Sequence, residues 1–263
     1  MLRENRVKRA LKQGQVVIGT MISEMRSPAV AQIMAGAGFD FMFIDMEHGT
    51  YTIETVADMI KVARLAGIVP LVRVPDPYYF LLSRPLDAGA MGLMVPRIED
   101  QATVEHIVRS VKYPPLGSRG CSTFRGHSDY TPQPNLREFT NFQNEEVLVI
   151  LQIERREAIE RIEGIAAVPG VDVCLIGPND LTLSLGAHSR HDPMVVTAIE
   201  RVIAACDAAG IASGIHIPDV EELGMWMWKG MRMITCSSDT GFLSSGAQQA
   251  VRRLRALAQD VEV

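Results

Sequence analysis

The stretch Phe41-Met42-Phe43-Ile44-Asp45-Met46-Glu47-His48-Gly49 joins an apolar run to three ionisable side chains and a glycine. A strand that is buried on both faces has such a continuous apolar sequence, because neither face meets water. The ionisable residues therefore lie at the carboxyl end of the strand, where ligands bind in parallel α/β folds. Similar strand ends follow at residues 71–73, 149–154 and 174–180. This recurrence is typical of an enzyme.

Short apolar runs recur along the whole chain, and most of them are separated by residues with helical spacing. They span residues 16–22, 41–46, 71–74, 92–95, 147–154, 171–176, 212–217 and 231–236. Strands and helices that alternate in this way predict a (β/α)8 TIM barrel, formed by a single domain of residues 1–263. The alternative is an open, doubly wound sheet. The count of strands and the lack of a Gly-rich phosphate motif after the first strand favour the barrel.

The segments between the strands complete this picture. Helices are predicted at residues 28–38, 52–67, 99–112, 156–168, 193–209, 220–229 and 242–258. Residues 2–13 have the pattern of a short amphipathic helix that could close the lower end of the barrel. The connection between residues 112 and 146, after the fourth strand, is rich in Pro, Gly and aromatic residues. Such a long loop is often a lid or a binding loop.

Composition excludes several classes of protein. The chain is 47% hydrophobic and 22% charged, with a net charge of −5 and no block of one sign, so neither nucleic acid nor an anionic membrane is an expected partner. No run approaches the ~20 apolar residues that span a bilayer, and the polar first residues do not resemble a secretory signal. The cysteines form no C-x-x-C pair, which favours a reduced, cytoplasmic setting.

Two carboxylates are candidate metal ligands. Side chains alternate along a strand, so Gln152 and Glu154 point the same way, and two polar groups there are costly to bury unless they face a site. Asp180 follows the sixth strand, which would adjoin the fifth in a barrel. Such a pair can share one divalent cation, with water and substrate oxygens in the other positions. The alternatives are a salt bridge from Glu154 to Arg155 or Arg156, and Asp180 as a helix N-cap.

Three further side chains fit acid–base and charge-stabilising roles. His48 is a candidate general base, with the Asp45 carboxylate in reach to raise its basicity; the alternative is a histidine that merely forms hydrogen bonds in a loop. Arg73 ends the third strand and suits a carboxylate or a developing enolate, unless it pairs with Asp76. His216 lies at another strand end and is expected to line the pocket.

The lysines give a negative result. A Schiff-base enzyme needs a lysine that points into the pocket, but none of the five ends a predicted strand. An electrophilic metal is then the more plausible means of stabilising a carbanion. The five are Lys8, Lys12, Lys61, Lys112 and Lys229.

Several motifs occur in an order that resembles the HpcH/HpaI family of metal-dependent (class II) pyruvate aldolases. The resemblance covers nearly the whole barrel and implies a fold of the phosphoenolpyruvate/pyruvate type. The matching stretches are residues 35–40, 44–48, 71–73, 86–90, 113–120, 152–154, 176–181 and 239–240.

The resemblance implies a role for each candidate residue. Glu154 and Asp180 would bind Mg²⁺, Mn²⁺ or Co²⁺, which pyruvate would chelate through its keto and carboxylate oxygens. Arg73 would stabilise the enolate, and His48, supported by Asp45 and Asp87, would move the proton of the aldol hydroxyl. The implied substrate-binding residues are Gln152, Gly177, Pro178, Asn179, Asp180 and His216.

The resemblance also implies an assembly and a reaction. The family forms trimer-based hexamers with swapped C-terminal helices, so a homo-oligomer is expected, and Asp87 could act from a neighbouring subunit. The implied reaction cleaves a 4-hydroxy-2-oxo acid into pyruvate and an aldehyde through a metal-bound pyruvate enolate. The alternatives are a citramalyl- or malyl-CoA lyase-like enzyme and a non-catalytic barrel that binds 2-oxo acids.

Two departures from the family pattern concern the aldehyde side. The loop after Arg119-Gly120 reads Cys121-Ser122-Thr123, unlike the best-known members, and His216 stands where those members carry an apolar residue. Both positions are expected to line the acceptor side of the site, so the aldehyde preference does not follow from the resemblance.

Overall fold

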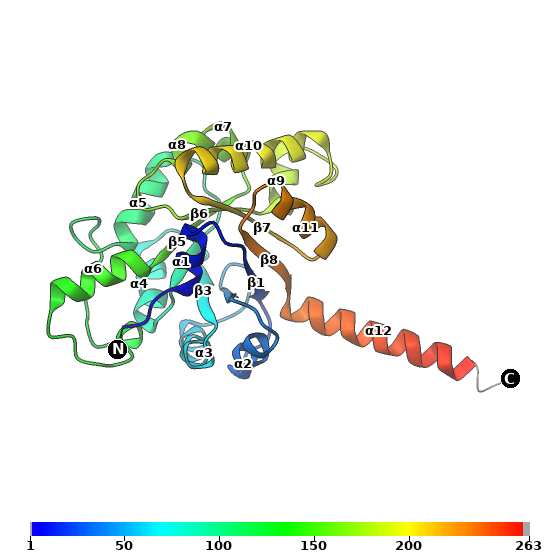
Figure 1. Cartoon of the computed structure of the whole chain (residues 1–263), viewed down its shortest axis with the longest axis horizontal. Coiled ribbons are helices and arrows are strands. Elements are labelled where there is room, and N and C mark those ends of the chain that lie inside the picture. Colours follow the sequence, from blue (N-terminus) through cyan, green and yellow to red (C-terminus); the bar gives the residue numbers. More distant parts are fainter. Residues whose placement is uncertain (1, 260–263) are drawn as a thin grey trace.

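A closed barrel of parallel strands forms the centre of the molecule (Figure 1). The computed structural model describes residues 2–259, and each strand in it pairs with its neighbours in chain order, β1 to β8, before β8 closes onto β1. This confirms the predicted barrel and excludes the open sheet. The strands are β1 (Val17–Ile22), β2 (Phe41–Asp45), β3 (Val69–Arg73), β4 (Gly92–Val95), β5 (Leu148–Ile153), β6 (Val173–Ile176), β7 (Ala212–Ile217) and β8 (Met233–Ser238).

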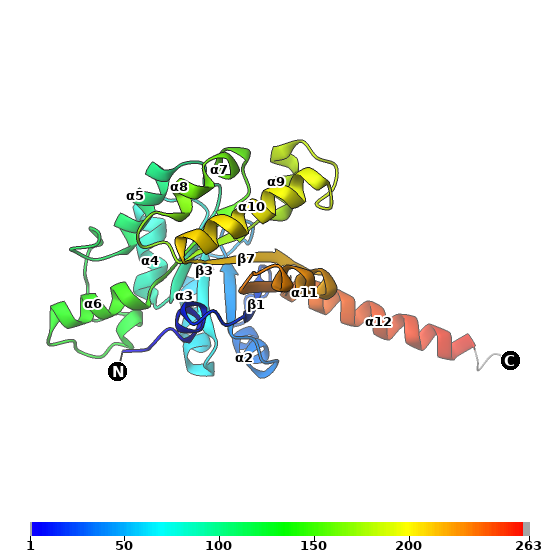
Figure 2. The same ribbon diagram turned by 45° about the horizontal axis from the view of Figure 1, so that its top comes forward.

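Helices surround the barrel in both ribbon views (Figure 2). They are α1 (Arg6–Lys12), α2 (Ala29–Gly36), α3 (Ile53–Ala66), α4 (Tyr79–Ala88), α5 (Gln101–Val111), α6 (Leu136–Glu146), α7 (Arg156–Glu160), α8 (Ile162–Ala166), α9 (Pro178–Leu185), α10 (Pro193–Ala209), α11 (Val220–Trp228) and α12 (Asp239–Gln259). The predicted N-terminal helix corresponds to α1, whose Lys8 reaches the amino ends of β5 and β6.

Strand β2 shows why the decisive stretch is apolar throughout. Phe41 and Phe43 belong to the cluster inside the barrel, whereas Met42 and Ile44 pack with the helices outside it. All four side chains are fully buried, and burying each contributes about 1.5–3 kcal/mol. The Phe41 ring fits because its neighbour on β1 is Gly19, where a Cβ atom would occupy the same space. The two faces of β2 therefore hold the core together and fix where its carboxyl end lies.

The segment between residues 112 and 146 corrects one prediction. Its second part is a helix, α6, and not an irregular loop, and a short 3-10 turn spans Gly126–Ser128. The Asn135 side chain caps α6 by accepting the Glu138 N–H at 3.1 Å, and Phe139 packs on the Tyr113 ring, with 6.2 Å between ring centroids. The helix forms because of this cap and this buried ring.

A second difference lies between β3 and β4, where α4 forms although the sequence indicated no helix. Pro85 inside α4 breaks the pattern expected of a helix interior. The predicted helix at residues 156–168 is also divided into α7 and α8 at Arg161, whose conformation is not helical. These changes lie in the outer layer and leave the strand ends where the sequence places them.

The last helix, α12, projects away from the barrel (Figure 1). Asp239, its first residue, is buried and accepts backbone N–H groups of Glu24 and Met25, so the root of α12 is tied to the loop after β1. Within residues 2–259, no helix combines the length and apolar character needed to cross a membrane. The four cysteines are free thiols.

Candidate functional site

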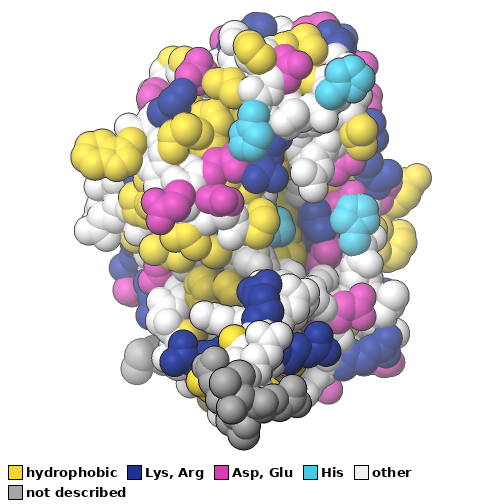
Figure 3. All heavy atoms as spheres, turned by 90° about the vertical axis from the view of Figure 1, so that its right-hand side faces the viewer, with side chains coloured by type: hydrophobic (Ala, Val, Ile, Leu, Met, Phe, Trp, Pro, Cys, Tyr) yellow, Lys and Arg dark blue, Asp and Glu magenta, His cyan; other side chains and the backbone are white. Residues whose placement is uncertain are grey.

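A cavity of about 220 Å³ lies at the carboxyl ends of the strands. Figure 3 looks onto the face from which α12 projects, and side chains of both charges gather with histidines around a hollow there. Most of the predicted site residues line this cavity. They are His48, Arg73, Gln152, Gly177, Pro178, Asn179, Asp180 and His216.

Arg73 is held from several sides. Its Nε and NH2 groups donate to the two carboxylate oxygens of Asp45 at 2.9 and 2.6 Å. Its NH1 group lies 3.3 Å from Glu47 and donates to Gln152 at 3.4 Å. Burial alone would lower the pKa of the guanidinium, but the hydrogen bond and charge of Asp45 outweigh it, so the pKa of Arg73 is raised. The predicted alternative, a pair with Asp76, does not form, because Asp76 lies beside Arg97.

Asp45 orders the loop that carries His48. Besides binding Arg73, its carboxylate accepts the backbone N–H groups of Glu47 and His48 at 3.0 and 3.3 Å. Burial would raise the pKa of this carboxyl, but Arg73 and the two N–H groups outweigh that effect and lower it. The carboxylate thus contacts the backbone of His48 and not its imidazole, so Asp45 positions His48 through the loop.

Glu154 follows β5 and is 3% exposed. One carboxylate oxygen accepts the backbone N–H of Arg97 at 2.8 Å, and the other accepts the side-chain amide of Gln152. Gln152 thereby links Glu154 to Arg73. In the described residues Glu154 forms no salt bridge with Arg155 or Arg156, which excludes the structural alternative for this carboxylate.

Asp180 lies in the first turn of α9, where the helix dipole favours a carboxylate. The N-cap of this helix is Gly177, so the alternative reading of Asp180 as the N-cap is wrong. A Cβ atom on Gly177 would lie 2.7 Å from the Glu154 carboxylate. Glycine at this position therefore leaves open the space beside Glu154 that faces α9.

The donor set fits a hard cation with open coordination positions. Across residues 2–259, no group of three or more His, Cys, Asp and Glu residues could hold a metal by itself. The candidate pair, Glu154 and Asp180, offers only carboxylate oxygens, which Mg²⁺ and Mn²⁺ accept together with water and substrate oxygens. A closed zinc site of Cys and His ligands has no counterpart in this part of the chain.

Asp87 lies apart from this cavity. It belongs to α4, and its carboxylate accepts a hydrogen bond from Arg119 at 2.6 Å. The Arg119 side chain is completely buried and stacks on the Tyr113 ring, 4.7 Å from its centroid. Asp87 therefore does not lie with His48 in the cavity of a single chain.

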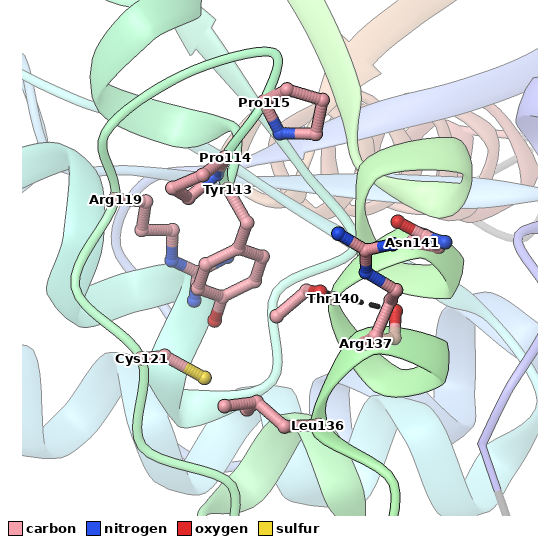
Figure 4. Close-up of a pocket in the computed structure, with 9 residues that line it drawn as sticks. All are labelled: Tyr113, Pro114, Pro115, Arg119, Cys121, Leu136, Arg137, Thr140 and Asn141. Carbon is pink, nitrogen blue, oxygen red and sulfur yellow. Dashed lines mark hydrogen bonds between the residues drawn. The ribbon is translucent and has the colours of Figure 1, made fainter.

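A larger cavity, of about 740 Å³, lies beside this pair (Figure 4). The loop with Tyr113 and Arg119 forms one wall, and α6 forms the other through Arg137, Thr140 and Asn141. No carboxylate or histidine lines it, so it lacks the acid–base groups that gather at the strand ends. Chemistry, and not volume, identifies the smaller cavity as the candidate active site.

Two further residues belong to the site but had no assigned role. Glu47 lies between Arg73 and Arg97, and burial, with the nearby charge of Glu154, raises its pKa. The sequence feature that could have identified Glu47 is its position two residues after Asp45, because side chains two apart on an extended segment point to the same side. Arg97 presents its backbone N–H to Glu154 from a left-handed conformation, with φ of 56°, which no sequence pattern announces.

The barrel and the polar groups at its strand ends define an enzyme of the α/β-barrel class, and comparison with known proteins gives its family. The sequence profile of the HpcH/HpaI aldolase/citrate lyase family matches residues 20–245. The chain belongs to this family, and it is a carbon–carbon lyase.

Named relatives agree with this placement. The chain is 34% identical over 259 residues to a hydroxypyruvate/pyruvate aldolase of Paraburkholderia phytofirmans, covering 95% of this chain and 98% of the relative. It is 30% identical to a 5-keto-4-deoxy-D-glucarate aldolase of Escherichia coli O6:H1, covering 93% and 94%. Among solved structures, an HpcH/HpaI aldolase of Desulfitobacterium hafniense superposes with a TM-score of 0.90 at 34% identity, covering 94% and 96%.

Proposed function

We propose that this enzyme is a metal-dependent pyruvate aldolase. It cleaves, or forms, 4-hydroxy-2-oxo acids and yields pyruvate and an aldehyde. The observation that carries the proposal is the Arg73 guanidinium, which is fixed by Asp45 and linked through Gln152 to the buried carboxylate of Glu154. A fixed cation beside an available carboxylate suits a reaction in which negative charge develops on one oxygen.

The pyruvate half of the substrate would lie against Arg73 and Gln152. Glu154 and Asp180 would hold Mg²⁺, Mn²⁺ or Co²⁺, and the bound ion would supply positive charge that stabilises an enolate. Arg73 would donate to the developing enolate oxygen. Its Nε and NH2 groups are held by Asp45 at 2.9 and 2.6 Å, so the group that would turn to the substrate is NH1, whose contacts with Gln152 and Glu47 are longer, at 3.4 and 3.3 Å. The backbone at Gly177 and Pro178 and the side chain of Asn179 complete this wall.

His48 would act on the other half of the substrate. In cleavage it accepts the proton of the C4 hydroxyl, the C3–C4 bond breaks, and its electron pair forms the enolate of pyruvate. A proton from water at C3 then completes pyruvate, His48 returns its proton to water, and the aldehyde leaves. His48 suits this role because it lines the cavity from the loop that Asp45 orders.

Metal removal tests the proposal directly. Enzyme stripped with EDTA should lose aldol formation from pyruvate and an aldehyde, and Mn²⁺ should restore it. Glu154→Gln should abolish the restored activity, because it removes one of only two carboxylates. Glu157→Gln, at an exposed glutamate on α7, serves as the matched control. Turnover that survives complete metal removal would refute the proposed function.

We also propose a homo-oligomer of three or six copies. Leu243 and Leu254 of α12 are 64% and 65% exposed, and Ile18, on the outer side of β1, is 43% exposed. Helix α12 points away from the barrel, so a second copy could bury its exposed leucines and Ile18. Light scattering on the full chain should give three or six times 28.9 kDa, and the mass of a single chain would contradict this proposal.

A further inference from the structure

His216 is a polar residue that lines the active-site cavity beside several apolar side chains. It lies on β7, adjacent to β6, and lines the cavity together with Met21, Phe43 and Leu175. Arg73, Gln152 and the residues at the start of α9 line the same cavity, and the proposed function assigns them to pyruvate and its metal ion. Apart from the proposed base His48, His216 is the polar lining residue that this assignment leaves for the aldehyde.

One imidazole nitrogen of His216 is already committed. Its Nε2 lies 3.0 Å from the backbone carbonyl oxygen of Ser237. A carbonyl can only accept, so Nε2 must carry the hydrogen and donate it. Ser237 has a φ of 53° at a point where the pairing of β8 with β1 shifts in register, and Thr20 donates to the same carbonyl at 3.4 Å. The irregularity at Ser237 thus fixes the tautomer of His216.

The other nitrogen, Nδ1, has no hydrogen-bond partner anywhere in residues 2–259. The charged groups that act on the ring are Arg73 on β3 and Asp45 on β2. Burial, the largest influence, lowers the pKa of His216, and the charge of Arg73 lowers it further. With Nε2 protonated and the ring neutral, Nδ1 is a pure acceptor.

We infer that His216 is a specificity-determining residue whose Nδ1 accepts a hydrogen bond from a hydroxyl group of the acceptor aldehyde. The inference rests on the proposed aldolase function and names its second substrate as a hydroxyaldehyde. A carboxylate at the same place finds no donor on His216, and a methyl group leaves Nδ1 unsatisfied. Both are costlier than a hydroxyl.

Two aldehydes of equal size test this inference. Glycolaldehyde and propanal differ by a hydroxyl in place of a methyl group, so the ratio of their kcat/KM values isolates the hydrogen bond. The wild-type enzyme should prefer glycolaldehyde. His216→Leu should lower the ratio by about two- to twelvefold, which corresponds to one net hydrogen bond. His188→Leu, at an exposed histidine, should keep the wild-type ratio.

A conservative variant separates the acceptor role from packing. His216→Asn can place its amide oxygen near the position of Nδ1, so its ratio should lie closer to the wild-type value than that of His216→Leu. Equal loss in both variants, or an unchanged ratio in His216→Leu, would overturn the inference. A wild-type enzyme that uses propanal as well as glycolaldehyde would also overturn it, whether or not the variants fold.

Failure of the inference is distinguishable from failure of the proposed function. Incubating wild-type enzyme with pyruvate and Mn²⁺ in D₂O should place deuterium in the methyl group, because that exchange needs only the enolate and no aldehyde. Without exchange, the aldolase proposal itself fails. With exchange but no preference for the hydroxyaldehyde, only the role of His216 is refuted.

Discussion

At the rim of the barrel, Arg73 lies between Asp45, Glu47 and Gln152, whereas at the floor two lysines donate to one carbonyl oxygen. Lys8 and Lys112 both reach the carbonyl of Val147 at 2.8 Å. Lys8 also pairs with Asp172 at 2.8 Å, while the second bond of Lys112 goes to the Asn144 carbonyl at 2.7 Å. Both ends bury basic groups, but Arg73 donates to a carboxylate, whereas the hydrogen bonds of Lys112 within residues 2–259 go to backbone carbonyls.

The consequence is a different protonation at each end. Asp45 raises the pKa of Arg73 despite burial, so the rim keeps a permanent charge for the reaction. At the floor, burial and then the nearby Lys8 lower the pKa of Lys112 to about 7. A neutral amine has two N–H groups, which match its two carbonyl acceptors. A buried base thus stays charged where its partners are acids, and gives up its proton where they are neutral.

The largest effect on turnover should come from replacing Arg73 at the rim. Arg73→Lys keeps the positive charge but loses the fork that binds Asp45 on one edge and reaches the substrate with the other. We expect kcat/KM for the aldol reaction to fall by about 10²–10³-fold, as when one donor to a developing oxyanion is removed. Arg84→Lys, at a cation that lies over Phe80 on α4, is the matched control. Wild-type turnover in Arg73→Lys would show that the rim does not need a fixed guanidinium.

A smaller effect should appear at the floor, in stability and not in turnover. The unfolded chain keeps Lys112 protonated up to its ordinary pKa of 10.5, whereas the folded protein releases the proton near pH 7. Between these values the unfolded state binds more protons, so the free energy of unfolding rises with pH, by up to ~1.4 kcal/mol per unit. Below about pH 7 both states are protonated and the folded protein bears the full penalty.

Denaturant unfolding of wild type and Lys112→Met at pH 6, 7.5 and 9 measures this effect. The difference in unfolding free energy between the two proteins should move in favour of wild type as pH rises. Lys61→Met, at an exposed lysine paired with Asp58, should give a constant difference. If the difference for Lys112→Met is also constant, Lys112 stays charged in the folded protein and its contrast with Arg73 disappears.

The sequence predicts the barrel because its strands are buried on both faces. Such strands give continuous apolar runs, and the observed strands fall within a few residues of the predicted ones. Helices with irregular patterns are harder to predict. Helix α4 is not predicted because Pro85 is unusual inside a helix. The start of α6 is not predicted because its N-cap, Asn135, follows a segment rich in Gly and Pro.

The site is predictable as a set of residues and less so as a network of contacts. Strand ends place His48, Arg73 and Gln152 around one cavity, as their positions in the sequence indicate. Which hydrogen bonds these side chains form depends on the angle at which the strands meet. Nothing in the sequence distinguishes Asp45 bound to Arg73 from Asp45 bound to His48, and the N–H that Arg97 gives to Glu154 follows from its backbone conformation alone.

The missing side chain at Gly177 marks a part of the cavity that does not tolerate substitution. Any other amino acid there would place its Cβ atom against the Glu154 carboxylate, whereas position 216 on β7 already carries a side chain that lines the cavity. Engineering of new aldehyde preferences should therefore begin from β7 and leave the turn into α9 alone. The same constraint applies to natural sequence variation in this barrel. Residues that contact the aldehyde can change, whereas the turn beside Glu154 must keep glycine, whose side chain is a single hydrogen atom.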